Sequence, residues 1–420
     1  MNPDRPDFNS FETTVSALFS RVRGHIVPGA HRMRRLLQPE TLARLSTLPT
    51  VLVAGTNGKG TTCSLLEQTF RDSKFKTGLY TSPHIVCPTE RIRIGGHPIA
   101  RSEFLEVSQR VFQRAQQHLA DATFFELMTT IAFEYFVLVE IEILVCEVGL
   151  GGRLDSTNIT SPTVSVLTSV GLDHTEWLGV DEESIAREKA FISRRNRTLV
   201  VGHTNTAARN GINSATQVTG AATRYINDCG QDVNGSIPLA EATIEEFARA
   251  TGLKIPTQQV SISATKHFWP GRFDFRKVKS VSVIFDAAHN SHGVEYFLTK
   301  AHACAHKLPR PWILVYASLA DKDWEKSILL LNRHFDAIYF TETQSTRSVK
   351  TDLLMSHACS IGASCSLSCH SHASKALESS LEHTRAMNGT MFVLGSITLI
   401  GESFEHWEIP VFSEQEKVQE

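Results

Sequence analysis

The chain has 420 residues, of which 41% are hydrophobic and 20% charged, and its formal net charge at pH 7 is -2. This length predicts two domains, and the near-neutral charge argues against a nucleic-acid surface as the main purpose. Four glutamates interrupt the most apolar stretch, 131–150, so no membrane span is expected. The N-terminus has no basic segment followed by an apolar one, so no signal peptide is expected, and eight scattered cysteines are typical of reduced thiols in the cytoplasm.

Strands and helices alternate along the chain, which predicts α/β domains with parallel sheets and helices on both faces. The first half predicts strands at 51–54, 77–81, 142–146 and 163–170, and helices at 61–73 and 124–137. The stretch 203–236 is polar and weakly periodic, and we interpret it as a poorly specified end of the first domain. A second alternation follows Trp269, with strands predicted at 281–285, 312–316, 337–340 and 391–394. The expected domains are 1–268 and 269–420.

The strongest local signal is Gly55-Thr56-Asn57-Gly58-Lys59-Gly60-Thr61-Thr62, between a predicted strand and a predicted helix. Glycines let the backbone approach a phosphate, and a helix N-terminus offers unpaired N–H groups. Lys59 can neutralise terminal phosphates and the Thr61 hydroxyl can bind Mg²⁺. The spacing departs from the usual phosphate loop, because Gly60 separates Lys59 from Thr61. We predict a phosphate site in a doubly wound domain like those of P-loop ATPases; a solvated lysine in a glycine-rich turn is the alternative.

Three more polar side chains, Ser82, Glu147 and His174, each follow a predicted strand. Ligands of an open parallel sheet collect outside the carboxyl ends of its strands. Together with Thr61, these side chains could hold a Mg²⁺ ion that also touches phosphate oxygens, although imidazole is an unusual ligand for this ion. A hydrogen-bonded loop histidine is the alternative for His174.

Two other motifs are less specific by themselves. Lys189, in Glu188-Lys189-Ala190, is interpreted from its neighbours alone as an exposed helix lysine. Asp286 ends the first strand of the smaller, Rossmann-like second domain, the same topological position as the phosphate loop. A zinc site is not predicted, because no common spacing is matched by Cys365, Cys369, His370 and His372.

In this order, six sequence blocks resemble the folylpolyglutamate synthase/dihydrofolate synthase branch of the Mur ligase superfamily. The resemblance runs from about residue 30 to about residue 405 and is weakest between about 203 and 265. The blocks are 55–62, 81–84 with 90–92, 123–126, 147–158, 171–179, and 270–273 with 286–290.

The resemblance implies a role for each block. ATP would be bound by Asn57, Gly58, Lys59, Gly60, Thr61, Arg272 and Asp286. Two Mg²⁺ ions would be held by Thr61, Ser82, Glu147, His174 and Lys189, the last as a carbamate formed with CO₂, which requires a depressed lysine pKa. The pterin site would be lined by Thr123, Phe124, Phe125, Glu126, Leu154, Asp155 and Ser156. Lys59, His174 and Lys189 would be the catalytic residues.

The implied reaction has two steps. A substrate carboxylate attacks the γ-phosphate of ATP to give an acyl phosphate and ADP, and the amine of L-glutamate then displaces phosphate from the acyl carbon. The acceptor would be dihydropteroate, a reduced folate that gains a polyglutamate chain, or both. We expect a cytoplasmic monomer with small-molecule partners and no nucleic acid or membrane.

Three alternatives follow from the same residues. A Mur ligase of peptidoglycan synthesis is disfavoured by the block 123–126 and by the lack of a separate N-terminal domain for its substrate. A non-catalytic member that binds pterin or nucleotide is motivated by 235–243, where the asparagine that usually contacts adenine is missing, and by Phe191, where the family usually has glycine. An unrelated P-loop kinase or GTPase would fit the loop but not the block 286–290.

Overall fold

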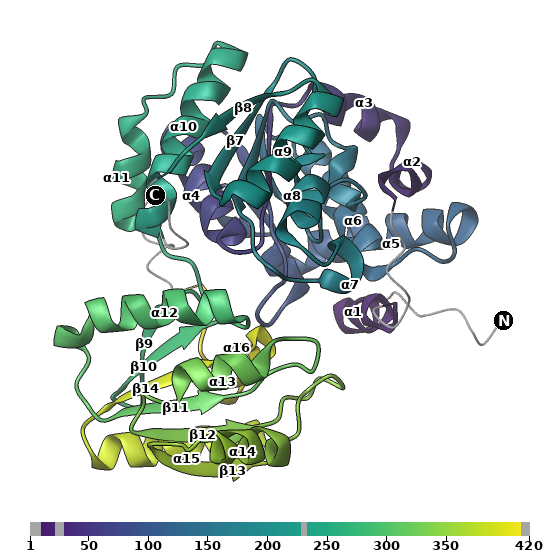
Figure 1. The fold of residues 1–420 in the computed structure, drawn as a ribbon. Coiled ribbons are helices and arrows are strands. Elements are labelled where there is room, and N and C mark those ends of the chain that lie inside the picture. Colours follow the sequence, from purple (N-terminus) through teal and green to yellow (C-terminus); the bar gives the residue numbers. More distant parts are fainter. Residues whose placement is uncertain (1–9, 22–28, 228–232, 413–420) are drawn as a thin grey trace. The chain divides into compact units, whose positions relative to one another are not determined.

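The computed structural model describes residues 10–21, 29–227 and 233–412. The chain divides into two compact units, Met1–His267 and Phe268–Glu420, whereas the sequence placed the border after residue 268. Each unit is built on its own sheet with helices on both faces, so the expected α/β class is confirmed (Figure 1).

The first unit contains a sheet in which β2, β5, β1, β6, β7 and β8 are parallel, while β3 and β4 extend the β2 edge in antiparallel pairs. The central strands β1 and β5 are mainly apolar and fully buried, as expected for a sheet covered on both faces, whereas the last strand, β8, is partly exposed. In spatial order the strands are β4 (His97–Pro98), β3 (Ile92–Ile94), β2 (Thr77–Tyr80), β5 (Ile143–Glu147), β1 (Thr50–Ala54), β6 (Val164–Ser169), β7 (Thr198–His203) and β8 (Ala222–Tyr225).

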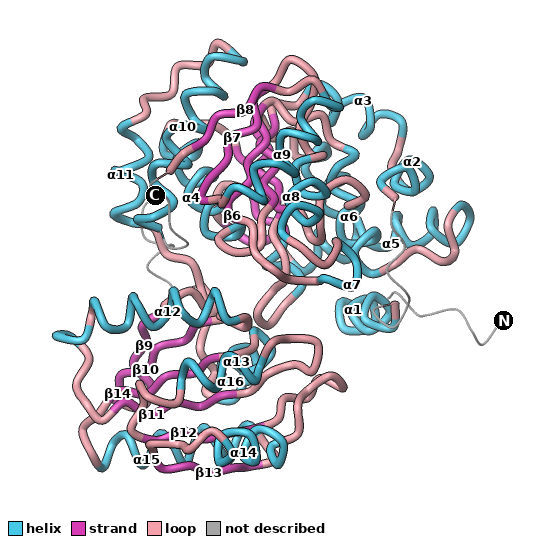
Figure 2. Tube along the Cα trace, viewed as in Figure 1, coloured by secondary structure: helices cyan, strands magenta, loops and turns pink. Residues whose placement is uncertain are grey.

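Helices cover both faces of this sheet (Figure 2). One face packs against α6, α8 and α9 in a continuous apolar core. On α4, Phe70 contacts Phe247 of α10, with ring centroids 4.8 Å apart. The helices are α1 (Phe11–Ser20), α2 (Met33–Leu36), α3 (Pro39–Thr47), α4 (Lys59–Asp72), α5 (Arg101–His118), α6 (Phe124–Leu138), α7 (Thr175–Leu178), α8 (Glu182–Ala190), α9 (Thr206–Thr219), α10 (Val233–Thr251) and α11 (Gln258–Lys266), with 3₁₀ turns η1 (Ala30–Arg32), η2 (Pro88–Arg91) and η3 (Ser156–Ile159).

The interpretation of 203–236 as poorly specified is wrong. The segment holds the end of β7, the whole of α9 and β8, and the start of α10; residues 228–232 lie outside the described part. The buried positions of α9 do follow helical spacing, but they are mostly small or polar: Ala208, Gly211, Ile212, Ala215 and Thr216. A side chain at Gly211 would overlap the backbone carbonyl of Glu183 in α8. This close helix contact selects small residues, which give a weak hydrophobic signal.

The second unit has five parallel strands with β9 antiparallel at one edge. One face of its sheet packs against α12, α13 and α14. The strand order is β13 (Ser366–His370), β12 (Ala337–Thr341), β11 (Trp312–Tyr316), β14 (Thr390–Leu394), β10 (Val281–Asp286) and β9 (Asp274–Val278). The helices are α12 (Ser291–Ala303), α13 (Trp324–Leu331), α14 (Thr351–Ser360), α15 (Ala373–Ala386) and α16 (Ile397–His406), with a 3₁₀ turn η4 (Ala305–Lys307). Among the described residues of both units, no helix has the length and apolarity needed to cross a membrane.

Candidate functional site

The predicted phosphate and metal residues of the first unit follow four neighbouring strands and lie at the carboxyl ends of these strands. The spatial order β2-β5-β1-β6 places the segments that follow these strands side by side at their carboxyl ends. The chain leaves β1 towards β2 and leaves β6 towards β7, in opposite directions, so β1 and β6 form a topological switch point. Ligands of such sheets bind in the crevice at this point.

The phosphate loop is fixed by hydrogen bonds from β6. The carbonyl of Asn57 accepts from the hydroxyls of Thr168 at 2.7 Å and Ser169 at 3.1 Å. Gly55 has φ +152°, and a Cβ there would overlap Thr168 Oγ1. Gly58, with φ +79°, is the N-cap of α4, so a glycine allows the left-handed turn that starts the helix. The loop is therefore shaped before any ligand binds.

Two lysine ammonium groups meet at one carbonyl of this loop. Lys59 Nζ donates to the carbonyls of Gly55 at 3.0 Å and Thr56 at 3.2 Å, and Lys189 Nζ donates to the same Gly55 oxygen at 3.1 Å. Lys59 belongs to the first turn of α4, together with Gly60 and Thr61. The first N–H groups of a helix have no intrahelical acceptor, so this turn combines a cation with free donors.

Lys189 is buried, and its interpretation as an exposed helix lysine is wrong. Its side chain is 4% exposed because it lies on the inner face of α8 with Ile185 and Ala186. Burial and, to a smaller extent, the positive charge of Lys59 lower the pKa of Lys189 to about 7, against the opposing effects of Asp173 and Asp155. The depressed lysine pKa that carbamate formation requires is present.

A small cavity of about 20 Å³ adjoins both lysines. Its walls come from the phosphate loop, the segment 148–151 after β5, and Asp173 and His174 after β6. The structure thus brings Lys59, His174 and Lys189, the three predicted catalytic residues, to one cavity. His174 has φ +52° and a side chain 41% exposed, with Nε2 3.7 Å from Asp173 Oδ2.

The oxygen ligands predicted for the metal lie nearby. Glu147 is 3% exposed, and its Oε2 accepts from the backbone N–H of Ser82 at 3.0 Å. Thr61 is 4% exposed. A buried carboxylate and two hydroxyls are the donor types that Mg²⁺ prefers, so these residues fit that ion. The ammonium form of Lys189 does not, because a cation cannot ligate a metal.

The segment 123–126 begins α6. Thr123 donates through its backbone N–H and its hydroxyl to Glu126 Oε2, at 2.8 and 2.9 Å, and its hydroxyl accepts from the Glu126 N–H. Arg32 Nε donates to the other Glu126 oxygen at 2.7 Å, and the glutamate is 2% exposed. These two polar residues therefore form a capping box tied to a buried ion pair. Their effect is to fix where the following aromatic rings lie.

Phe124 belongs to an aromatic cluster that the sequence analysis missed. Its ring stacks on Phe19 of α1, with centroids 5.4 Å apart, and the Arg91 guanidinium lies 5.0 Å from its centroid. Arg91 Nε donates to His84 Nδ1 at 2.8 Å, and burial together with this cation lowers the pKa of His84 to about 3. His84 is therefore neutral. The sequence analysis assigned no role to Phe19, because α1 contains none of the motifs that indicated the site.

Phe125 and the segment 154–156 adjoin the loop after β5. The Phe125 ring covers Gly149, where a side chain would overlap it. Asp155 accepts from Leu150 N–H at 2.9 Å and caps η3, and burial raises its pKa. Ser156 is buried, whereas Leu154 is 40% exposed. Leu154 is thus the member of this segment that offers surface to a ligand.

Arg272 and Asp286 lie together in the second unit. Asp286 accepts from the N–H groups of Phe273 at 2.7 Å and Ala288 at 2.8 Å. Burial raises the pKa of Asp286, and the exposed Arg272 is the main cation that opposes this shift. Through these two hydrogen bonds, the Asp286 carboxylate at the end of β10 links the turn that contains Phe273 to the turn that precedes α12.

The stretch compared with the adenine segment, 235–243, lies in α10. Leu239 is buried, and Ser236 Oγ accepts from Thr62 Oγ1 of α4 at 3.4 Å. The flank of the phosphate-loop helix is therefore occupied by small and apolar side chains from α10.

A fixed phosphate loop at the switch point of one α/β unit, followed by a second α/β unit, defines a nucleotide-binding protein of the Mur ligase type. Residues 53–234 match the Mur ligase middle domain, and residues 271–397 match the Mur ligase glutamate ligase domain. The chain is 34% identical to the dihydrofolate synthase/folylpolyglutamate synthase of Escherichia coli (strain K12) over 325 residues, 73% of this chain and 75% of that protein. It belongs to the dihydrofolate synthase/folylpolyglutamate synthase family.

Solved structures agree with this assignment. E. coli FolC in complex with DHPP and ADP is similar with a TM-score of 0.81 and 29% identity, covering 96% of this chain and 98% of that one. The bifunctional folylpolyglutamate synthase/dihydrofolate synthase of Yersinia pestis, complexed with AMPPNP and a Mn ion, is similar with a TM-score of 0.82 and 25% identity, covering 97% and 100%.

Proposed function

We propose that this chain is an ATP-dependent ligase that joins L-glutamate to dihydropteroate, to a reduced folate, or to both, through an acyl phosphate. The observation that carries the proposal is the meeting of Lys59 and Lys189 at the Gly55 carbonyl, beside the N-terminus of α4. This concentration of positive charge suits the triphosphate of ATP, and the family relatives with bound ADP or AMPPNP support it.

The residues of the chain act by neutralising and orienting charge. Lys59 would exchange its loop carbonyls for phosphate oxygens, while the first-turn N–H groups of α4 bind the same phosphates. In the first step an oxygen of the substrate carboxylate bonds to the γ-phosphorus and ADP leaves. In the second, the neutral glutamate amine bonds to the acyl carbon, phosphate leaves with the bonding pair, and the nitrogen loses one proton to give the amide. Arg272 and Asp286 are further candidates for ATP, supported by the match of 271–397 to the glutamate ligase domain.

A divalent ion fits beside these phosphates. Thr61, Ser82, Glu147 and His174 are the residues that would hold it, and a relative with a bound Mn ion supports a divalent site. When bound, Mg²⁺ would neutralise charge on the phosphate oxygens.

We assign the pterin to the surface made by the start of α6 and by Leu154. Phe124 would present the edge of its stacked ring and Leu154 its exposed side chain. Thr123 and Glu126 would act indirectly, because both are committed to the helix cap. The relative that binds DHPP supports a pterin site in this fold.

A carbamate on Lys189 completes the proposal. The neutral amine would attack CO₂, forming an N–C bond and releasing one proton. The product is an anion beside Lys59, so it replaces the repulsion between two cations with an attraction, and its oxygens suit a second Mg²⁺. Lys189→Ala should lose turnover and regain part of it with acetate, whereas Lys189→Arg should gain nothing, because the guanidinium fills the space. An active Lys189→Ala variant without acetate would refute the carbamate.

The decisive experiment for the function measures phosphate release by the purified protein with ATP and Mg²⁺. Dihydropteroate and tetrahydrofolate are each tested with and without L-glutamate, and the product is identified by mass. We expect release that depends on both the pterin and glutamate. Binding of ATP and pterin without any product would support the non-catalytic alternative and refute the proposal.

A further inference from the structure

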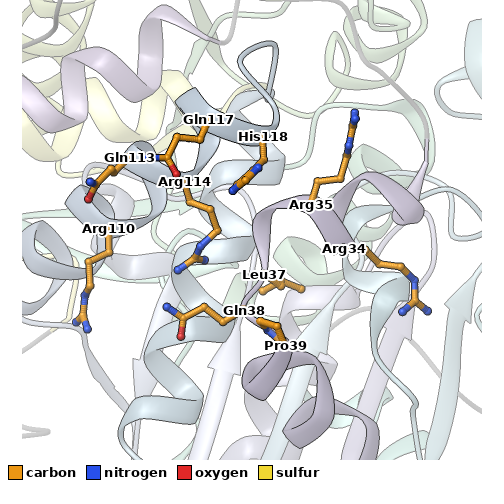
Figure 3. Close-up of a pocket in the computed structure, with 10 residues that line it drawn as sticks. All are labelled: Arg34, Arg35, Leu37, Gln38, Pro39, Arg110, Gln113, Arg114, Gln117 and His118. Carbon is orange, nitrogen blue, oxygen red and sulfur yellow. The ribbon is translucent and has the colours of Figure 1, made fainter.

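A basic cleft of about 740 Å³ opens in the first unit between α5 and the segment that joins α2 to α3 (Figure 3). We call it the basic cleft. Among the described residues that line it, none is acidic. Its volume is in the range of small-molecule sites. The charged and amide side chains that define it include Arg34, Arg35, Gln38, Arg110, Arg114 and His118.

Three basic side chains of α5 stand in one row. Arg110, Arg114 and His118 follow one another at intervals of four residues, which in an α-helix is about 6 Å per step. The buried face of α5, which carries Phe104, Ser108 and Ala115, adjoins this row along the helix. Figure 3 shows Arg114 and His118 extending from α5 towards Leu37 and Gln38 across the cleft. Arg114 and His118 are therefore directed into the concave surface, whereas Arg110 lies at its margin (Figure 3).

Two of the four arginines that line the cleft form ion pairs within the fold. Arg114 is anchored at 2.8 Å to Glu134. Arg110 pairs with Glu106 at 3.2 Å, but both side chains are about half exposed or more, and such pairs are weak and readily exchanged. Within the described part of the chain, the side chains of Arg34 and Arg35 form no hydrogen bond or ion pair, and Arg35 contributes only a longer-range charge effect that lowers the pKa of Asp121. The cleft thus combines one firmly paired arginine, Arg114, with three arginines that are weakly paired or form no ion pair among the described residues.

The cleft adjoins the segment assigned to the pterin. Arg32 directly precedes α2 and binds both Glu126 of the α6 cap and Asp121, and His118 is the last residue of α5, three residues before Asp121. The same short stretch of chain therefore supports the start of α6 and one wall of the cleft.

We propose that the basic cleft binds the oligo-γ-glutamate chain of folates that already carry several glutamates; this inference rests on the proposed function. A γ-linked chain has five backbone bonds per residue and one free carboxylate per residue, so its carboxylates recur about every 6 Å of extended chain. That interval equals the step between Arg110 and Arg114, the two arginines of α5 in the cleft. The pterin end and the reacting carboxylate of a growing chain are both held at the active site. The glutamate residues between them must therefore loop away from the line that joins these ends. A basic surface beside the pterin site gives their carboxylates a place to bind.

The test compares the ligation-competent full-length protein with Arg35→Gln/Arg110→Gln, which removes one exposed arginine from each wall. The matched control, Arg197→Gln/Arg333→Gln, removes two exposed arginines elsewhere. Calorimetry measures binding of free penta-γ-glutamate, of penta-α-glutamate with the same charge, and of tripolyphosphate. We expect the γ-linked peptide to bind the wild type and the control more tightly than the other two anions, and the cleft variant at least about fivefold more weakly. Equal affinity for the three anions, or unchanged binding by the cleft variant, would overturn the inference.

Steady-state kinetics with long and short folate substrates tests the basic cleft separately from the proposed ligase function, on which this inference rests. With a pentaglutamyl folate, the cleft variant should show a raised KM with little change in kcat, and with the monoglutamate the ratio kcat/KM should stay within about twofold of the control. Absence of turnover with every folate would refute the proposed function, whereas the peptide measurement would still decide the cleft. Normal turnover with an unchanged KM for the long substrate would refute the cleft alone.

Discussion

Replacing Lys189 with methionine should make the protein more stable while it abolishes ligation. Methionine has a similar length and no charge, so it fits a buried position that an ammonium group occupies at a cost. The Gly55 carbonyl loses one donor but keeps Lys59 at 3.0 Å, so no buried acceptor is left unpaired. The variant therefore isolates the cost of placing a second cation beside the phosphate loop.

The size of the effect follows from the pKa of Lys189. The folded pKa is about 7, against about 10.4 for an unfolded lysine. Because the unfolded chain binds more protons between these values, wild-type stability rises with pH across this window. The buried Lys189 then lowers the unfolding free energy of the wild type by about 5 kcal/mol at pH 6 and by about 2 kcal/mol at pH 9. The difference in unfolding free energy between Lys189→Met and the wild type should therefore decrease by about 3 kcal/mol from pH 6 to pH 9.

Urea unfolding of both proteins at pH 6 and pH 9 measures this difference. The buffers contain no bicarbonate and no divalent metal, so that Lys189 remains an amine. A difference in unfolding free energy that is the same at both pH values, or a variant less stable than the wild type at pH 6, would show that Lys189 does not carry a depressed pKa and would remove the physical basis of the carbamate.

Three more changes test the site. Lys59→Ala should reduce kcat at least about a hundredfold with unchanged circular dichroism, because it removes a phosphate contact from the first turn of α4; near-normal turnover would contradict the phosphate-loop assignment. Phe124→Ala should raise the KM for dihydropteroate much more than that for ATP, as steady-state kinetics would show, and equal rises would argue against a pterin role. Gly55→Ala should lower the unfolding free energy by about 2 kcal/mol or more, since the new Cβ overlaps Thr168; an unchanged urea midpoint would mean that the loop is not as tightly fixed as the structure shows.

The sequence predicted eight strands, which correspond to β1, β2, β5, β6, β10, β11, β12 and β14, because most of them are short apolar runs. It did not predict β3, β4, β7, β8, β9 or β13. The stretch 312–316 coincides with β11, and 281–285 lies within β10. The prediction failed for 203–236, where close packing between helices selects small residues in place of large hydrophobic ones. In α9 the contact with α8 is so close that Gly211 and Ala215 serve where larger apolar residues would normally mark a buried face.

The phosphate loop could be predicted from sequence because its chemistry is local. Glycines, a lysine and a hydroxyl stand within eight residues, next to a strand and a helix. The burial of Lys189 could not be predicted in that way, because it depends on which face of α8 the fold turns inward. The cluster of Phe19, Arg91 and Phe124 joins three segments that are distant in the sequence, so no local sequence pattern indicates it.

Both unusual features of the first unit concentrate positive charge where the fold itself gains nothing from it. Lys59 and Lys189 share one carbonyl oxygen, and Arg34 and Arg35 stand without ion pairs among the described residues beside the row of α5. Like charges at short range destabilise a compact state unless an anion compensates them. A triphosphate, a carbamate and a chain of carboxylates are anions that the proposed reaction brings to these places. Anions that bind the folded state more tightly than the unfolded chain stabilise it, so the cost of the cations is offset when substrates are bound.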